Sequence, residues 1–171
     1  MDNGTGEVLA HTTATTTVPA TVKIHMLDRQ KPMSWWLMPE FLDRVKEFCL
    51  KEDTDSDATL LTETIMRDFV AEQHVFALMV GIAESRVCGH LLASIDRWYE
   101  KRFCTVLQYK WDKGLGVSRG LIQAGFDSLS DWANLNQCVE IQALVPDLRH
   151  VRRLKMLYGF RPHKTLMRKE I

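Results

Sequence analysis

Apolar side chains recur at helical spacing in two neighbouring stretches in the first half of the chain. The first runs from Trp35 to Leu50 and the second from Thr59 to Glu72. In both, large apolar residues return every three or four positions, as on the buried face of an amphipathic helix. The acidic stretch KEDTDSD separates them, and Asp57 or Thr59 is placed to cap the second. The pattern therefore predicts two helices.

Extended patterns dominate the middle of the chain. Three strand-like stretches, HVFALMVGIAE, RVCGHLLASIDRWY and FCTVLQYKW, are joined by short polar connections. Short connections favour antiparallel neighbours, so we expect a β-meander. An earlier short strand is expected over Thr21 to Leu27, where β-branched and polar residues alternate.

The last third of the chain alternates helical and extended patterns. We expect a helix over Leu115 to Asn134, a strand over Val139 to Val145, a helix over Leu148 to Leu157 and a final strand in HKTLMRKEI. The whole order is typical of an α/β (α+β) fold with one mixed, mostly antiparallel sheet of about six to seven strands flanked by about four helices.

The length of 171 residues is enough for one well-packed domain, which we place at residues 21–171. Residues 1–20 are rich in threonine and poor in large apolar groups, so we expect a flexible N-terminal arm. Lysine and arginine balance aspartate and glutamate over the whole chain, but bases are concentrated between Arg149 and Lys169. That end could therefore hold an anion.

The cysteines point to a reducing compartment. Cys49, Cys88, Cys104 and Cys138 are scattered through apolar runs without the spacing of a zinc site, so we expect buried free thiols and no bound metal. No apolar run approaches the roughly 20 residues that span a bilayer. These features predict a soluble, cytoplasmic protein without a membrane partner.

Three glycines, Gly114, Gly116 and Gly120, lie close together where a predicted strand gives way to a predicted helix, in the stretch WDKGLGVSRGLIQAG. An ATP-type loop would end in Gly-Lys-Ser or Gly-Lys-Thr, which is absent, and the dinucleotide pattern GxGxxG fails because Gly120 comes one position late. A third pattern, R/Q-x-x-G-x-G/A, matches with Lys113 and Ser118 at its two substituted ends. The alternative is a plain strand-to-helix turn whose glycines serve packing alone.

With this loop in this order of elements, the chain resembles the GNAT superfamily of acyl-CoA-dependent N-acetyltransferases. The resemblance implies that the loop binds the pyrophosphate of acetyl-CoA (coenzyme A) through backbone N–H groups at a helix N-terminus. It also implies that the fourth and fifth strands splay apart, and that backbone groups of the fourth strand meet the thioester. The cofactor-binding residues so implied are Leu107, Gln108, Lys113, Gly114, Leu115, Gly116, Val117 and Ser118.

The C-terminal part matches the resemblance only partly. Gly159-Phe160 fits the end of the family's Asn-x-x-Ala-x-x-x-Tyr-x-x-x-Gly-Phe pattern, but Lys155 stands where the thiolate-protonating tyrosine is usual. Tyr158 lies three residues later, and Lys155 could instead stabilise a leaving thiolate electrostatically. Glu140, in the fifth predicted strand, is the candidate base, although a surface glutamate explains it equally well. The stretch also resembles compact bacteriophage proteins of GNAT fold.

Several other side chains allow two interpretations. His90 lies in an apolar strand and is expected to be a core histidine. Trp35, Trp36 and Trp98 could wall an acceptor pocket or pack in the core. Asp96 and Glu100 are expected to be solvated turn residues, and the side chains that could line the cleft are Gln108, Tyr109, Glu140 and Gln142.

Two functions remain open from the sequence. The first is an acetyl-CoA-dependent N-acetyltransferase that moves an acetyl group to a primary amine, on a small molecule or a protein, by direct attack. The alternative is a catalytically degenerate GNAT-fold structural or interaction protein, such as a phage virion component. A phage-encoded protein would be found in the host cytoplasm or in the virion, with a homo-oligomer or virion partner bound through the arm. The basic C-terminal helix would permit nucleic acid by charge, but the aromatic interleaving of single-strand binders is absent.

Overall fold

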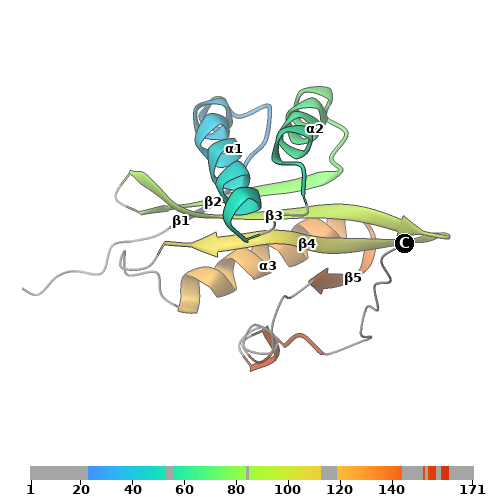
Figure 1. The fold of residues 1–171 in the computed structure, drawn as a ribbon. Coiled ribbons are helices and arrows are strands. Elements are labelled where there is room, and N and C mark those ends of the chain that lie inside the picture. The colour runs from blue at the N-terminus through green and yellow to red at the C-terminus, as the bar shows by residue number, and fades with distance from the viewer. Residues whose placement is uncertain are drawn as a thin grey trace, which may run out of the picture.

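A five-stranded sheet in the order β1-β2-β3-β4-β5 forms the middle layer of the structure, a computed structural model (Figure 1). Residues 23–52, 56–83, 85–112, 119–143, 152, 154–156 and 159–161 are described. The strands are β1 (Lys23–Met26), β2 (Phe76–Ala83), β3 (Arg86–Trp98), β4 (Lys101–Trp111) and β5 (Cys138–Ala143). Neighbouring strands are antiparallel, except that β4 and β5 are parallel.

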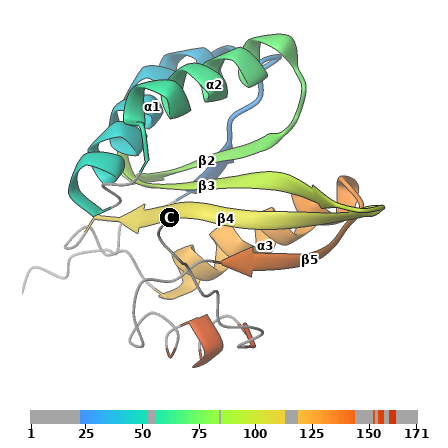
Figure 2. The same cartoon turned by 45° about the vertical axis from the view of Figure 1, so that its right-hand side comes forward.

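Helices cover both faces of this sheet. α1 (Pro32–Glu52) and α2 (Ala58–Ala71) lie on one face, and α3 (Arg119–Leu135) lies on the other, as Figures 1 and 2 show. Residues 152 and 154–156 are helical and belong to the predicted fourth helix. The α/β fold class is therefore confirmed, with five strands described where about six to seven were expected. The arm at 1–20 and the last predicted strand lie outside the described residues.

Local sequence explains where the helices begin. α1 starts at Pro32, three residues before the predicted Trp35, because proline is well suited to a first helical position, where no N–H partner is needed. α2 is capped as predicted by Asp57, whose Oδ1 accepts from the backbone N–H of Thr59 at 2.9 Å and of Leu60 at 3.0 Å. It ends before Glu72, which adopts a left-handed conformation.

The two sheet faces bury separate apolar cores. Against α1 and α2 the sheet contributes alternate residues that include Leu78, Val80 and Leu92. We call this side the α1/α2 face. Against α3 it contributes Met79, Leu91 and others, and this is the α3 face. Alternation of this kind follows from the two-residue period of a strand.

The indole ring of Trp111 lies on the α3 face and explains two glycines, Gly81 and Gly89. A Cβ atom at Gly81 would lie 2.4 Å from Trp111 Cζ3, and one at Gly89 would lie 2.2 Å from Cε3 and 2.6 Å from the Lys110 carbonyl oxygen. Gly125 of α3 is less crowded, with its nearest ring atom at 3.5 Å from such a Cβ. Gly81 and Gly89 therefore give the ring its place on β2 and β3.

We expect the Gly89→Ala variant to lose about 1 to 3 kcal/mol of unfolding free energy, because the added methyl group overpacks against the ring and a backbone carbonyl. Gly125→Ala is the matched control and should be neutral or gain about 0.5 to 1 kcal/mol, since alanine is favoured inside a helix. Urea denaturation of both variants is the measurement. An equal effect of the two substitutions would contradict the packing assigned to Trp111.

Candidate active site

A β-bulge interrupts β4 at Leu107. In the pairing with β3, Leu92 faces Gln108 and Ala93 faces Val106, so Leu107 is the extra residue. The extra residue reverses the alternation of the strand. Val106 packs on the α3 face, whereas Gln108, which in a regular strand would share that face, contacts α1 on the other side. Leu107 itself is 38% exposed between two buried neighbours.

The sheet opens at the same point. The β4–β5 pairs run from Arg102–Cys138 to Val106–Ala143 and stop directly before the bulge. Within the described part of the chain, the stretch from Leu107 to Trp111 therefore has no strand beside it on the β5 side. Figure 2 shows β4 continuing well past the end of β5. The predicted separation of the fourth and fifth strands corresponds to this opening, which we call the β4–β5 opening.

Three buried side chains next to the bulge, those of His90, Gln108 and Cys49, are joined by hydrogen bonds. The Oε1 atom of Gln108 lies 3.3 Å from Nε2 of His90, and its Nε2 atom donates to Sγ of Cys49 at 3.2 Å. With the amide in this orientation, His90 carries its proton on Nε2. Gln108 is 3% exposed. Its side chain therefore points into the protein, and its backbone, rather than its amide, is what can face the β4–β5 opening.

His90 is the core histidine that the sequence predicted. It is 1% exposed, and the rings of Phe41 and Phe48 meet it edge-on at 6.0 and 6.2 Å. Burial is the main cause that lowers the pKa of His90 to about 4. The imidazole is thus neutral at neutral pH, and its Nδ1 atom has no hydrogen-bond partner within the described part of the chain.

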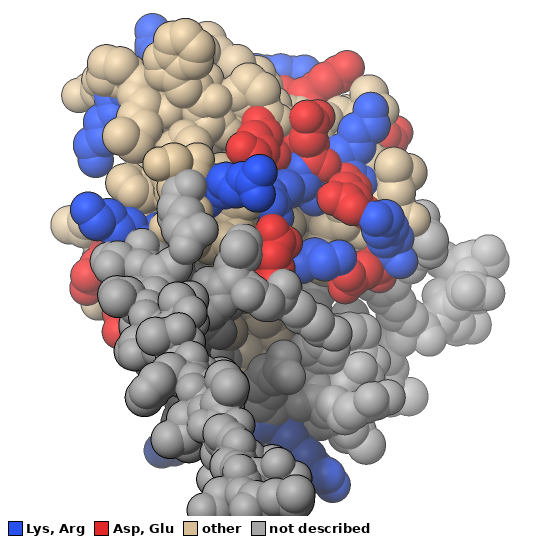
Figure 3. All heavy atoms as spheres, turned by 90° about the vertical axis from the view of Figure 1, so that its left-hand side faces the viewer, with Lys and Arg blue, Asp and Glu red and all other residues tan. Residues whose placement is uncertain are grey.

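An ion-pair network fixes the end of β4 to α1. Arg44 donates to both carboxylate oxygens of Asp112, at 3.0 and 2.9 Å, and to the carbonyl oxygen of Val87 at 2.6 Å. The hydrogen bond with Asp112 raises the pKa of the Arg44 guanidinium. Asp112 also donates its backbone N–H to Cys88. Figure 3 views this end of the molecule, where charged side chains of both signs are interspersed.

The predicted acid and base residues are not brought together at the bulge. Glu140 lies opposite Phe103 in the β4–β5 register, four residues before Leu107, or about 13 Å along the strand. It is exposed, and its Oε1 accepts from Gln142 at 2.6 Å. Lys155 is exposed as well. Tyr158 and the glycine loop from Lys113 to Ser118 lie outside the described residues.

The Gly-Phe pair joins the C-terminal segment to α3. Gly159 has a φ angle of 72°, which glycine adopts without strain. Phe160 then packs on Phe126 of α3, with ring centroids 5.6 Å apart, and donates its N–H to the carbonyl oxygen of Leu154 at 3.3 Å. Leu154 is buried in the core of the α3 face. The pair therefore serves packing.

The three tryptophans that could wall an acceptor pocket, Trp35, Trp36 and Trp98, are partly or largely exposed. Trp35 meets Phe69 edge-on at 5.1 Å and is partly exposed. Trp36 and Trp98 are 85% and 70% exposed, so core packing is wrong for both. Trp98 stands at the β3–β4 connection, away from the β4–β5 opening, because it pairs with the first residue of β4. Asp96 in β3 is exposed but accepts a hydrogen bond from Thr105 at 2.5 Å.

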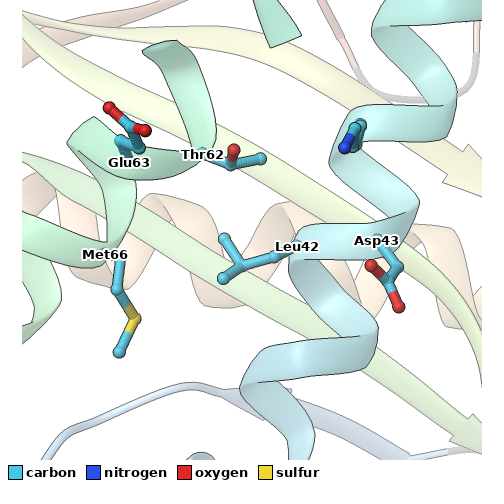
Figure 4. Close-up of a pocket in the computed structure, with 6 residues that line it drawn as sticks. Leu42, Asp43, Thr62, Glu63 and Met66 are labelled. Atoms are coloured by element: carbon cyan, nitrogen blue, oxygen red, sulfur yellow. The ribbon is translucent and has the colours of Figure 1, made fainter. Parts of the chain in front are cut away.

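A separate hollow of about 290 Å³ lies between α1 and α2 (Figure 4). Leu42, Thr62 and Met66 border the gap between the helices, and Asp43 and Glu63 stand at its two sides. It contains none of the residues that form the bulge. Among the described residues no group of histidines, cysteines and carboxylates could hold a metal ion, and no helix is long and apolar enough to cross a membrane.

The thiols show little sign of reactivity. Cys88 and Cys104 are buried, and burial raises the pKa of both, that of Cys104 to about 12. Both therefore stay protonated at neutral pH and lack the thiolate that a nucleophile requires.

The architecture matches solved acetyltransferases. A predicted acetyltransferase from Clostridium acetobutylicum, solved with acetyl-CoA, has a TM-score of 0.67 at 10% identity and covers 88% of this chain and 96% of its own. AAC(6')-Iy in complex with the bisubstrate analogue CoA-S-monomethyl-acetylneamine has a TM-score of 0.66 at 13% identity, covering 89% and 99%. Glucosamine-6-phosphate N-acetyltransferase from Arabidopsis thaliana has a TM-score of 0.59 at 11% identity, covering 88% and 98%.

No protein-family model matches the sequence, and the search of curated proteins also gives no match. At these identities the similarity to solved structures shows the fold. The chain has the fold of the GNAT acetyltransferases, which confirms the fold that the sequence resemblance implied.

The buried histidine predicts a pH dependence of stability. Between pH 6.5 and 4 the unfolded chain protonates this imidazole while folded His90 stays neutral, so lowering the pH through this range favours unfolding. The two pKa values imply a loss of about 3 kcal/mol of unfolding free energy, complete near pH 4. Denaturation of wild type and His90→Gln over this range should show the dependence reduced by that amount in the variant, whereas exposed His74→Gln should follow wild type. Parallel curves for wild type and His90→Gln would contradict the assignment.

Proposed function

We propose that the protein transfers the acetyl group of acetyl-CoA to a primary amine at the β4–β5 opening. The observation that supports this most directly is the coincidence of two features: β4 bulges at Leu107, and its pairing with β5 ends at Val106. A bulge re-aims backbone groups, and an opening between strands gives a ligand access to them. Both lie in a fold shared with solved acetyltransferases.

The backbone at the bulge supplies the polar contacts for the thioester. In this proposal the N–H group of Leu107 donates to the thioester carbonyl oxygen. A donor held by the sheet needs no reorganisation as negative charge develops on that oxygen, which is why fixed backbone donors are effective in acyl transfer. Val106 and Gln108 on either side are buried, so the donor is held by the core.

The acetyl-CoA phosphates would be bound beyond the C-terminal end of β4. The segment from Lys113 to Ser118 follows β4 directly, and α3 begins at Arg119. The first backbone N–H groups of a helix lack helical partners and favour an anion, and Lys113 would add a cation. Gly116 would allow close approach of the pyrophosphate.

Acid and base groups complete the proposal. The amine attacks the thioester carbon directly, its excess proton passes to Glu140, and the departing CoA sulfur receives a proton from Tyr158 or is stabilised by Lys155. The register places Glu140 too far from Leu107 for direct contact, so bridging water would carry the proton. An exposed carboxylate can act as a general base through such water molecules.

The structural neighbours support an amine as the acceptor but do not indicate which amine. One neighbour carries a bisubstrate analogue built on acetylneamine, and another is a glucosamine-6-phosphate N-acetyltransferase. A first screen would therefore use amino sugars, aminoglycosides and polyamines as acceptors for this chain.

Calorimetry of acetyl-CoA binding tests the cofactor site. Wild type should bind with micromolar affinity, and Gly116→Trp should abolish binding because the indole would fill the space proposed for the pyrophosphate. Leu60→Trp, at an exposed position on α2, is the matched control and should bind like wild type. No binding to wild type at millimolar acetyl-CoA would contradict the proposal and favour a GNAT-fold protein whose role is interaction.

Steady-state kinetics test the bulge donor. Leu107→Pro removes one backbone N–H at a place where sheets tolerate proline, and should lower kcat by about 100- to 1,000-fold. Leu107→Ala keeps that N–H and should lose far less. Acetyl-CoA binding should persist in both variants, and this result would show that both variants fold. Equal kcat values for the two variants would show that this N–H group is not the donor.

A further inference from the structure

We infer that the Gln108 side chain is a positioning residue: its amide fixes the place where β4 breaks its alternation, and so holds the Leu107 backbone toward the β4–β5 opening. The inference rests on the proposed function for its catalytic consequence. Its structural part concerns the bulge alone and can be measured without any turnover.

The alternation of β4 shows why the side chain matters. Cys104 and Val106 lie on the α3 face, and a regular strand would place Gln108 beside them in that apolar core. A carboxamide there would be buried without a partner, which is strongly unfavourable. The bulge at Leu107 moves the carboxamide to the α1/α2 face instead, where it forms hydrogen bonds with His90 and Cys49.

Those partners join three elements at one point. Gln108 of β4 accepts from His90 of β3 at 3.3 Å and donates to Cys49 of α1 at 3.2 Å. The rings of Phe41 and Phe48 on α1 both pack edge-on against His90. Both ends of the amide are therefore engaged by groups that cannot move freely, and a shift of the bulge by one residue would break both contacts.

The charged side chains near His90 do not change the hydrogen bonds that join His90, Gln108 and Cys49. Burial lowers the pKa of His90, and the charges of Arg44 and Lys110 act in the same direction. The hydrogen bond with Gln108 and the charge of Asp112 oppose these effects and are outweighed. Arg44 and Asp112 are paired with each other, and Lys110 is paired with Glu52. His90 thus stays neutral and keeps a proton on Nε2 for the amide oxygen of Gln108.

Trp111 anchors the strand on its other face. Its ring fills the space above Gly81 and Gly89, so the strand beyond the bulge is tied to the α3 face by Trp111 and to the α1/α2 face by Gln108. Before the bulge, Val106 is buried against the α3 face. Leu107 is the residue left between two anchored stretches, and its backbone orientation follows from theirs.

Gln108 acts through the backbone and not by touching the substrate. Its side chain is 3% exposed and bonded inward at both ends, so it cannot reach a ligand in the β4–β5 opening. Losing the amide should therefore disturb the geometry of the thioester contact more than the binding of the CoA phosphates, which would be bound elsewhere.

The first test is hydrogen exchange followed by NMR, which needs no activity. Gln108→Met keeps the size of the side chain but removes both hydrogen bonds. Those backbone amides of residues 107–109 that are hydrogen-bonded to β3 should then exchange about tenfold faster. The matched control is Gln123→Met on α3, which removes a surface hydrogen bond to Asp127. Unchanged exchange at 107–109 in Gln108→Met would overturn the structural part.

The second test separates positioning from stability. If wild type transfers acetyl groups, Gln108→Met should lower kcat by up to about 100-fold while the KM for acetyl-CoA changes little. Ile65→Val, in the core of the α1/α2 face and distant in sequence from the bulge, serves as a destabilised control. A similar loss of kcat in both variants, or a loss confined to KM, would overturn the catalytic part of the inference.

The two proposals fail in different ways. Absence of acetyl transfer by wild type would reject the proposed function and with it the catalytic role of Gln108. Faster exchange at 107–109 in the same Gln108→Met variant would still support the amide as the group that holds the bulge.

Discussion

The arrangement of the site depends on a one-residue change of register in β4. A strand has a side-chain period of two, so one extra residue exchanges the faces on which all later side chains lie. In this chain the extra residue is Leu107. It lets Val106 pack toward α3 and lets Gln108 reach His90 and Cys49 on the side of α1. Without it, with Val106 in place, both the amide of Gln108 and the indole of Trp111 would lie on the wrong face.

The same register change links packing to the proposed chemistry. β5 pairs with β4 only as far as Val106, so the distorted backbone of Leu107 lies where the sheet opens. Arg44 then ties Asp112, the last described residue before the glycine loop, to α1 and to the carbonyl oxygen of Val87. The second half of β4 is thus held at both ends, although it lacks a neighbouring strand on one edge within the described residues. A fixed strand beside an opening is a suitable support for backbone recognition of a ligand.

Much of the fold could be predicted because repeating patterns of apolar residues and local signals determine it. The helical repeats of α1 and α2, the cap at Asp57 and the short meander connections all follow from local physics, and all are found. The core position of His90 was predicted for the same reason. The start of α1 at Pro32 was missed because the predicted boundary was drawn at the first tryptophan instead of at the proline.

The site was less predictable because it depends on contacts between distant residues. Arg44 and Asp112 are 68 positions apart, and Cys49 and Gln108 are 59 apart, so no local pattern indicates either pair. One signal was present in the sequence: glutamine at 108 breaks the apolar alternation set by Cys104 and Val106, and such a break is typical of a bulge. The exposure of Trp36 and Trp98 could not be inferred from composition, because large aromatic residues serve cores and surfaces alike.

We propose that acetyl-CoA binds at the β4–β5 opening with its thioester at the bulge. An NMR titration of isotopically labelled protein with acetyl-CoA, compared with CoA alone, tests it most directly. We expect the amide signals of Leu107 and Gln108 to shift with both ligands and to differ between them, because only acetyl-CoA carries the carbonyl oxygen. Shifts confined to the hollow between α1 and α2, or identical signals at Leu107 and Gln108 with the two ligands, would contradict it.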